Sequence, residues 1–264
     1  MLLQASPHPA AIDWQHRATA NGGNTHNLHR EAANRLCKGL DSAGLSAKAV
    51  EIYPFLGDNV PAICTKLFYA KVGSSPVCRT VNFVSTNIIS FGGLKDSVNS
   101  TRSLLTDMVY STALGFREAD TSAHFYTRDT AAAGTSQVAI GSLLSGNNVT
   151  CGWLSAGSKE TGVIATTVTA SGTSTSTAGF HGSANLTSRA TQYFLNGVAT
   201  GTVGGTGTGS WVASSNAAVL FANPTTAYWK RDMLYADFFG RTTAADELRL
   251  SQVVKDFQRS LNRS

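Results

Sequence analysis

Tyr193-Phe-Leu-Asn-Gly-Val-Ala-Thr200 is the stretch that decides the fold class of this chain. Its central dipeptide, Asn196-Gly197, separates two short runs of β-prone residues. A type I′ turn needs a positive φ at both central residues, and Asn and Gly adopt that conformation most readily. The stretch therefore predicts a tight antiparallel hairpin in which Asn196 and Gly197 form the structural turn.

Short β-prone segments continue on both sides of this hairpin, from about residue 65 to residue 241. They are bounded by Gly, Ser and Asn turns and recur roughly every ten residues, which is the spacing of strands in a sandwich or barrel. No helical pattern separates them between residues 100 and 240, so repeated strand–helix–strand units are not expected. The sequence predicts an all-β fold, a sandwich of two antiparallel sheets.

Helical patterns are confined to the two ends of the chain. Residues 25–64 are expected to form a helical lead segment, because apolar residues such as Leu36 recur along one helix face. Residues 65–264 are expected to form the sandwich unit, which closes with a helix over 243–262. Thr243-Ala-Ala-Asp246 resembles a capping box at the start of that helix.

The first residues of the chain have a different composition. Residues 1–24 are rich in Pro, Ala and Gly and are expected to form an extended arm. Together with the lead segment, this arm is expected to hold the protein in a larger assembly. The predicted docking residues are Trp14 and Arg17 in the arm and Leu28 and Leu36 in the lead segment.

Composition limits the classes of partner. The 264 residues carry a net charge of +5, but only 14% of them are charged and the basic residues are scattered. A nucleic-acid-binding protein concentrates its charge in a patch or stripe, so no nucleic-acid partner is expected. The first residues lack the features of a signal peptide, and no apolar run approaches the ~20 residues of a membrane span. We therefore expect neither signal-directed secretion nor membrane insertion.

Motifs for metals and cofactors are missing from the sequence. The four cysteines form no C-x-x-C pair, and neither a calcium loop nor a Gly-rich phosphate loop is present. His26 and His29 lie three positions apart and could share a helix face, but they are expected to face solvent. We predict no cofactor and no metal ion.

The carboxylates offer one arrangement to weigh for catalysis. Hydrolysis of a glycosidic bond needs two carboxyl groups on opposite sides of that bond. Glu118 and Asp120 are neighbours on a single strand, which does not give that opposed geometry, and the G-x-S-x-G nucleophile motif is absent. We therefore predict no catalytic residues and a protein that is not an enzyme.

Two features together resemble the laminin-G-like, or concanavalin A-like, jelly-roll domains. The first is the hairpin, in which Phe194 and Leu195 stand between Tyr193 and the Asn-Gly turn where the family often has a single residue. The second is the ending over residues 234–257, in which a last strand runs into a capped helix. The resemblance implies a jelly-roll sandwich.

The front end is similar to the lead segment of laminin-G-like proteins that bacteriophages and prophages encode. The similar stretches are Ile12-Asp-Trp14, the helix up to Lys38-Gly-Leu40 and Ile52-Tyr-Pro-Phe-Leu-Gly-Asp58. Ser46 departs from this pattern, because the family often has Trp there. The resemblance implies a virion structural protein.

Three functions remain open on these grounds. The leading one is a virion structural protein on the particle surface, made in the host cytoplasm, which acts as an exterior decoration or adhesin-type subunit. Its partners would be other virion proteins and sister subunits. The alternative is a carbohydrate-binding module for a host-surface glycan. A third and weaker hypothesis is a sandwich-fold glycosidase that uses Glu118 and Asp120.

Aromatic side chains supply the candidates for glycan binding. Trp153, Trp211, Tyr228 and Trp229 lie in or beside predicted loops, where binding residues concentrate. Their flat rings could stack on sugar faces. Packing in the core or anchoring of loops is the competing interpretation, because Trp is usually well buried.

Overall fold

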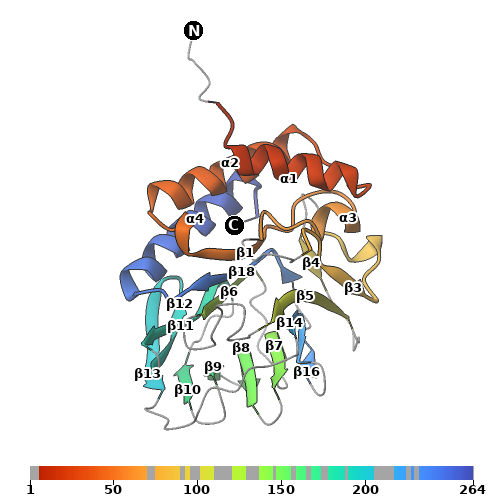
Figure 1. Ribbon diagram of the computed structural model, residues 1–264. Helices are drawn as coiled ribbons and strands as arrows, with labels where there is room; N and C mark the ends of the chain where they lie inside the picture. The colour runs from red at the N-terminus through yellow and green to blue at the C-terminus, as the bar shows by residue number, and fades with distance from the viewer. Residues whose placement is uncertain are drawn as a thin grey trace.

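The computed structural model describes most of the chain. The residues described are 6–69, 75–89, 93–95, 102–109, 121–128, 137–144, 147–155, 159–164, 168–173, 178–187, 190–204, 217–223, 227–228 and 232–263. They form a mostly β structure with one large antiparallel sheet and a few helices (Figure 1).

Helices lie mainly at the two ends of the described chain. They are α1 (Pro9–Ala20), α2 (Asn27–Ser42), α3 (Val60–Ile63) and α4 (Ala244–Ser260), with short 3₁₀ turns at Ser46–Lys48 and Ser85–Asn87. No helix in these ranges is both long and apolar enough to cross a membrane.

Along the chain, one described strand lies between α2 and α3, and the others lie between α3 and α4. In chain order they are β1 (Ala49–Tyr53), β2 (Phe68–Tyr69), β3 (Arg79–Val81), β4 (Leu94–Lys95), β5 (Ser103–Val109), β6 (Thr121–Thr127), β7 (Gln137–Leu144), β8 (Asn147–Ser155), β9 (Lys159–Ile164), β10 (Val168–Thr173), β11 (Gly179–Thr187), β12 (Ala190–Leu195), β13 (Val198–Gly204), β14 (Ala217–Leu220), β15 (Ala222–Asn223), β16 (Ala227–Tyr228), β17 (Asp232–Met233) and β18 (Tyr235–Gly240).

Fourteen of the described strands join in a single order of antiparallel neighbours. That order is β2-β1-β18-β6-β11-β12-β13-β10-β9-β8-β7-β14-β5-β3. β10 and β13, paired at Ser171 and Thr202, join the two halves of the sheet. Phe125 and Phe238 from one half share a hydrophobic cluster with Ile140 and Leu220 from the other.

A second hydrophobic cluster attaches the helices to the sheet. Trp14 of α1, Leu36 of α2 and Phe257 of α4 are buried with Phe180 and Tyr235 from the strands. The three long helices therefore form a layer over the β1–β18–β6–β11 part of the sheet (Figure 1). We call α1, α2 and α4 the helical layer.

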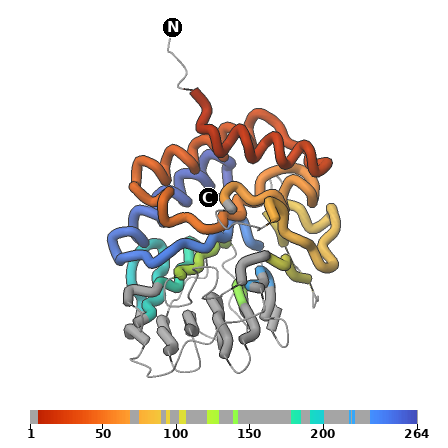
Figure 2. The backbone as a smooth tube through the Cα atoms, viewed as in Figure 1, coloured from red at the N-terminus to blue at the C-terminus, as the bar shows by residue number. Residues whose placement is uncertain are grey.

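Both ends of the described chain belong to this layer. Figure 2 shows the first and last segments (red and blue) on the same side of the molecule. The guanidinium of Arg263 is buried there and donates hydrogen bonds to the carbonyls of Leu234 (3.1 Å) and Phe55 (3.0 Å). This contact ties the end of the chain to the sheet and to the segment that follows β1.

The structure confirms the predicted hairpin. β12 and β13 pair antiparallel, and φ is 55° at Asn196 and 80° at Gly197. Gly197 is also required by packing, because a Cβ there would lie 2.7 Å from the Cα of Leu248 in α4. The turn therefore rests directly on the C-terminal helix.

The predicted C-terminal helix is also confirmed, as α4. The amide of Asp246 donates to the hydroxyl of Thr243 at 3.2 Å, and the amide of Thr243 donates to the Asp246 carboxylate at 2.8 Å. These two reciprocal bonds are the capping box that the sequence predicted.

The first 64 residues differ from the prediction in two ways. The expected extended arm contains α1, in which Pro9 stands in the first turn and the His8 side chain accepts a hydrogen bond from the amide of Ala10. Pro suits that position because it lacks the amide hydrogen that a first turn leaves unpaired. The expected helical lead contains β1, whose five residues are all buried and which pairs with β18 inside the sheet.

Candidate functional site

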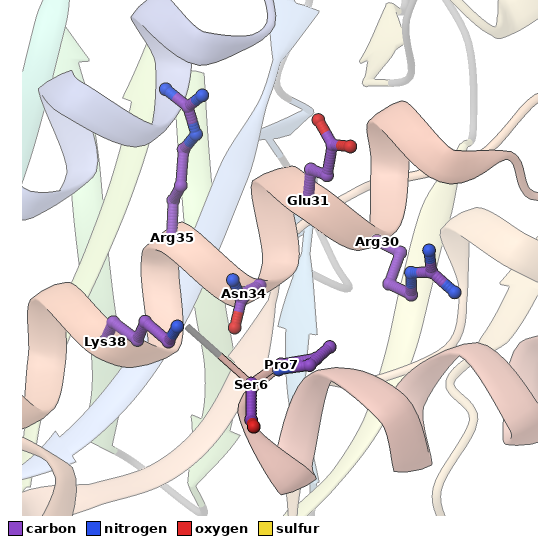
Figure 3. A pocket seen from close by; sticks show the side chains of 7 residues that line it. All are labelled: Ser6, Pro7, Arg30, Glu31, Asn34, Arg35 and Lys38. Carbon is purple, nitrogen blue, oxygen red and sulfur yellow. The ribbon is translucent and has the colours of Figure 1, made fainter. Parts of the chain in front are cut away.

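A pocket of about 530 Å³ opens on the outer face of α2, where the residues that precede α1 cross that helix (Figure 3). Three cations and one carboxylate among its lining side chains leave a formal charge of +2. The lining residues are Ser6, Pro7, Arg30, Glu31, Asn34, Arg35 and Lys38. We call this feature the cationic pocket.

The amphipathic pattern of α2 explains why these side chains face outward. Its apolar residues, among them Ala33, Leu36 and Leu40, are buried against the rest of the fold. The polar residues that alternate with them at helical spacing must then lie on the opposite face. The sequence of α2 therefore builds one wall of the pocket directly.

The other wall is Ser6 and Pro7, and the next residue, His8, holds this segment to α2 by hydrogen bonds. The amide of His8 donates to Oδ1 of Asn34 at 2.6 Å, and Nε2 of His8 lies 2.9 Å from a carboxylate oxygen of Asp41. Since Nδ1 of His8 accepts from the amide of Ala10, Nε2 carries the proton in the neutral ring and donates it to Asp41. The wall is thus fixed to the helix at two points.

The cations of the pocket have no partners among the described residues. Arg30, Arg35 and Lys38 form no ion pair there, whereas Arg249 and Arg259 each pair with an acid on α4. In Figure 3 the three pocket cations extend from α2 in separate directions. Guanidinium and ammonium groups that are not neutralised internally can bind a carboxylate or phosphate with charge-assisted hydrogen bonds.

A second polar cluster lies in the interior, between α4 and the sheet. Nδ1 of His124 is 2.5 Å from Asp237 and its Nε2 is 3.0 Å from Glu247, and all three side chains are fully buried. Burial alone would lower the pKa of His124, but the two carboxylates outweigh it and raise the pKa to about 10. The cluster is therefore a charged imidazolium between two carboxylates.

Close packing encloses this cluster. A Cβ on Gly182 would lie 2.6 Å from His124 and 2.8 Å from Glu247, so β11 passes directly over the pair. The hydroxyl of Thr242 donates to Glu247 at 2.5 Å. With no exposed face, the cluster resembles a catalytic constellation in composition only, and it acts as a structural link between β6, β18 and α4.

The structure places the predicted docking residues mostly inside the chain's own fold. Trp14 and Leu36 are fully buried, so they hold the helical layer to the sheet and cannot also contact a partner. Arg17 donates to the carbonyl of Lys66 at 2.8 Å and pairs with Asp13. Leu28, 36% exposed, is the member of the set that faces outward.

The remaining predicted site residues are only partly covered by the structure. Trp153 lies in β8 and Tyr228 in β16, but their side chains are outside the described part of the chain. Trp211, Trp229, Glu118 and Asp120 lie outside the described residues altogether. The glycan-binding set therefore stays a prediction.

Comparison with known proteins gives similarity of fold alone. No family model matches the chain, and no curated protein matches its sequence. A Trypanosoma rangeli sialidase in complex with the inhibitor DANA is similar over 91% of this chain, with 9% identity and a TM-score of 0.53. The chain spans 37% of that sialidase, so the comparison concerns a part of the enzyme.

Two further solved structures are similar at lower TM-scores. Domain 4 of AbnA, an extracellular arabinanase from Geobacillus stearothermophilus, was solved in complex with arabinotriose. It matches with 10% identity and a TM-score of 0.47, over 78% of this chain and all of that one. The binding domain of botulinum neurotoxin serotype D matches with 9% identity and a TM-score of 0.48, over 80% of this chain and 52% of that one.

These comparisons correct one prediction. The expectation that the chain is not an enzyme is wrong as an exclusion, because a similar fold occurs in part of a sialidase. The fold of this chain is therefore no evidence against enzymatic activity. The missing G-x-S-x-G motif and the neighbouring positions of Glu118 and Asp120 were too narrow a basis for the prediction.

Proposed function

We propose that this chain is a structural subunit on the surface of a bacteriophage virion, and that the cationic pocket docks it to an acidic segment of a neighbouring virion protein. The observation that carries the proposal is the group of three cations on α2 that lack acidic partners within the described chain. An acidic segment in the pocket would supply the missing charges and would be attracted from a distance as well.

The architecture supports such a role in a second way. Trp14 and Phe257 of the helical layer are buried in one cluster with residues of the sheet. The helix that carries the pocket is therefore connected to the sheet by buried packing. In this proposal the sheet is folded into a two-sheet jelly-roll sandwich, which the shared core of its two halves supports. The helical layer faces the particle and the sandwich faces outward.

The test is incorporation into particles. A phage that carries the gene is propagated with the wild-type chain or with the double variant Arg35→Glu/Lys38→Glu, and the chain is quantified in purified virions by mass spectrometry. We expect at least a tenfold loss for the double variant, because two favourable charge contacts become repulsive. Lys255→Glu, a charge reversal on α4 at a residue that does not line the pocket, is the matched control and should be retained.

Two outcomes would count against the proposal. Virions that lack the wild-type chain would overturn the structural role. Virions that retain the double variant at the wild-type level would overturn docking through the pocket. A glycan array on the purified protein separates the alternative function, since a specific glycan bound by a chain that is absent from virions would indicate a carbohydrate-binding module.

A further inference from the structure

Two histidines and an aspartate meet at the start of α2, on the rim of the helical layer. Nε2 of His26 lies 2.5 Å from Oδ2 of Asp58, and Nε2 of His29 lies 3.9 Å from Oδ1 of the same carboxylate. One potential ligand atom from each residue lies within 4.8 Å of the other two. No other group of this kind occurs among the residues that the structure describes.

His29 differs from the solvent-facing residue that its spacing predicted. Its side chain is fully buried and its Nε2 has no hydrogen-bond partner, although the atom points toward Asp58. A buried polar atom without a partner is costly, so a native structure usually supplies one. Burial, opposed by the charge of Asp58, lowers the pKa of His29 to about 4, which leaves a neutral imidazole at pH 7.

The two rings are arranged side by side. His26 and His29 stack with their centroids 4.3 Å apart and their planes 21° from parallel. His26 is about half exposed and Asp58 is one-third exposed, so the cluster is open to solvent on one side. An ion could reach the buried Nε2 of His29 from that side.

The backbone around Asp58 is fixed by contacts that do not involve the cluster. The amide of Asp58 donates to the carbonyl of Asn24 at 3.1 Å, and the amide of Asn24 donates to the Asn59 side chain at 2.8 Å. Gly57 has a φ of 120°, and a Cβ there would lie 2.3 Å from Ala62. The carboxylate is therefore held beside the start of α2 by the fold itself.

We propose that His26, His29 and Asp58 bind a divalent transition-metal ion, for which Zn²⁺ is the best match, with water in the fourth position. Imidazole nitrogens and a carboxylate oxygen are ligands that zinc accepts in tetrahedral sites with an open position. Bonds of roughly 2.0–2.2 Å place tetrahedral ligands about 3.4 Å apart. The exposed His26 ring can move to reach that separation.

Metal binding also requires a change of tautomer at His29. The backbone amide of His26 donates to Nδ1 of His29 at 3.3 Å, which places the ring proton on Nε2. Coordination through Nε2 moves that proton to Nδ1 and releases the amide of His26 to solvent. The lost bond is long and lies at the helix start, whereas the metal gives the unpartnered Nε2 a strong partner.

The experiment is a calorimetric titration of the chelator-treated protein with zinc sulfate at neutral pH. We expect one equivalent to bind, and at least a tenfold weaker affinity for Asp58→Asn and for His26→Gln. Both residues are partly exposed, so these variants should fold, which circular dichroism would verify. His16→Gln is the matched control, because His16 is exposed on α1 and outside the cluster.

A spectroscopic measurement completes the test. Substitution with Co²⁺ should give the intense visible absorption of a four-coordinate ion, and His29→Gln should abolish it. The proposal is overturned if wild-type protein binds no zinc up to millimolar concentration. It is equally overturned if the bound equivalent survives unchanged in Asp58→Asn and His26→Gln.

Discussion

Two histidine–carboxylate clusters in this molecule use the same residue types in opposite ways. In the interior, His124 lies between Asp237 and Glu247, and the two carboxylates raise its pKa to about 10 despite burial. At the rim of the helical layer, burial lowers the pKa of His29 to about 4, and the single carboxylate of Asp58, 3.9 Å away, does not offset the effect of burial. One ring is a cation and the other is neutral.

The difference shows that solvent access and the number of close carboxylates decide what such a cluster can do. A closed cluster, in which one imidazolium lies between two buried carboxylates, contributes to the fold provided that every member stays in place. An open cluster with an unpartnered nitrogen leaves a ligand atom available. Residue identity alone would have assigned the two clusters the same role.

The largest effect should come from removing the cation of the closed cluster. His124→Gln leaves two buried carboxylates without a positive partner, and breaking a buried ion pair in this way costs about 3–5 kcal/mol. We expect that loss in the free energy of unfolding measured by urea denaturation at pH 7. A loss below about 1 kcal/mol would show that the charge of His124 does not stabilise the fold. It would contradict the structural role assigned to the closed cluster.

The same substitution at His16 gives the baseline for that measurement. His16 is exposed on α1, so His16→Gln should change the free energy of unfolding by less than about 0.5 kcal/mol. The two variants carry an identical chemical change and differ only in surroundings. The difference between the two losses therefore measures the contribution of the closed cluster to the free energy of unfolding.

The sequence predicted the elements that are specified locally. The Asn196-Gly197 turn, the capping box at Thr243 and the apolar face of α2 each depend on residues within a few positions of one another. The sequence did not predict α1, because a segment rich in Pro and Ala was expected to form an extended arm. β1 was missed because its burial comes from pairing with β18, nearly two hundred residues later in the chain.

The two histidine–carboxylate clusters are formed by residues far apart in the sequence, so no local pattern predicts them. His124 meets Asp237 and Glu247 across sequence separations of 113 and 123 residues. His26 and His29 have a visible spacing, but Asp58 reaches them only because the loop before α3 is fixed to Asn24. The cationic pocket was the most accessible to prediction, since the polar face of α2 follows directly from its amphipathic pattern.

An intermediate effect should appear in the pH dependence of stability. The pKa of His124 is about 10 in the folded chain and about 6.5 when unfolded, so its contribution is complete below about pH 6.5 and is lost as the pH rises toward 10. Between pH 6.5 and 8.5 the free energy of unfolding should fall by up to about 1.4 kcal/mol per pH unit. His124→Gln should remove that slope.

The ring can also be observed directly in that experiment. Nitrogen-15 chemical shifts of His124 should report a doubly protonated imidazolium at pH 8, where an ordinary histidine is neutral. Burial raises the pKa of Asp237, and the charge of His124 opposes that rise. A neutral His124 ring at pH 8 would contradict the assignment of charge in the closed cluster.

The smallest effect should come from the open cluster in the absence of metal. His26→Gln removes a partly exposed contact with Asp58, and at such a site even a full ion pair contributes only about 0–1 kcal/mol because water screens it. Urea denaturation of the metal-free protein should therefore show a loss below about 1 kcal/mol, several times smaller than for His124→Gln. A loss as large as that of His124→Gln would mean that the open cluster is structural too, since a side chain half exposed to water can reach such a value only if the start of α2 unfolds without it.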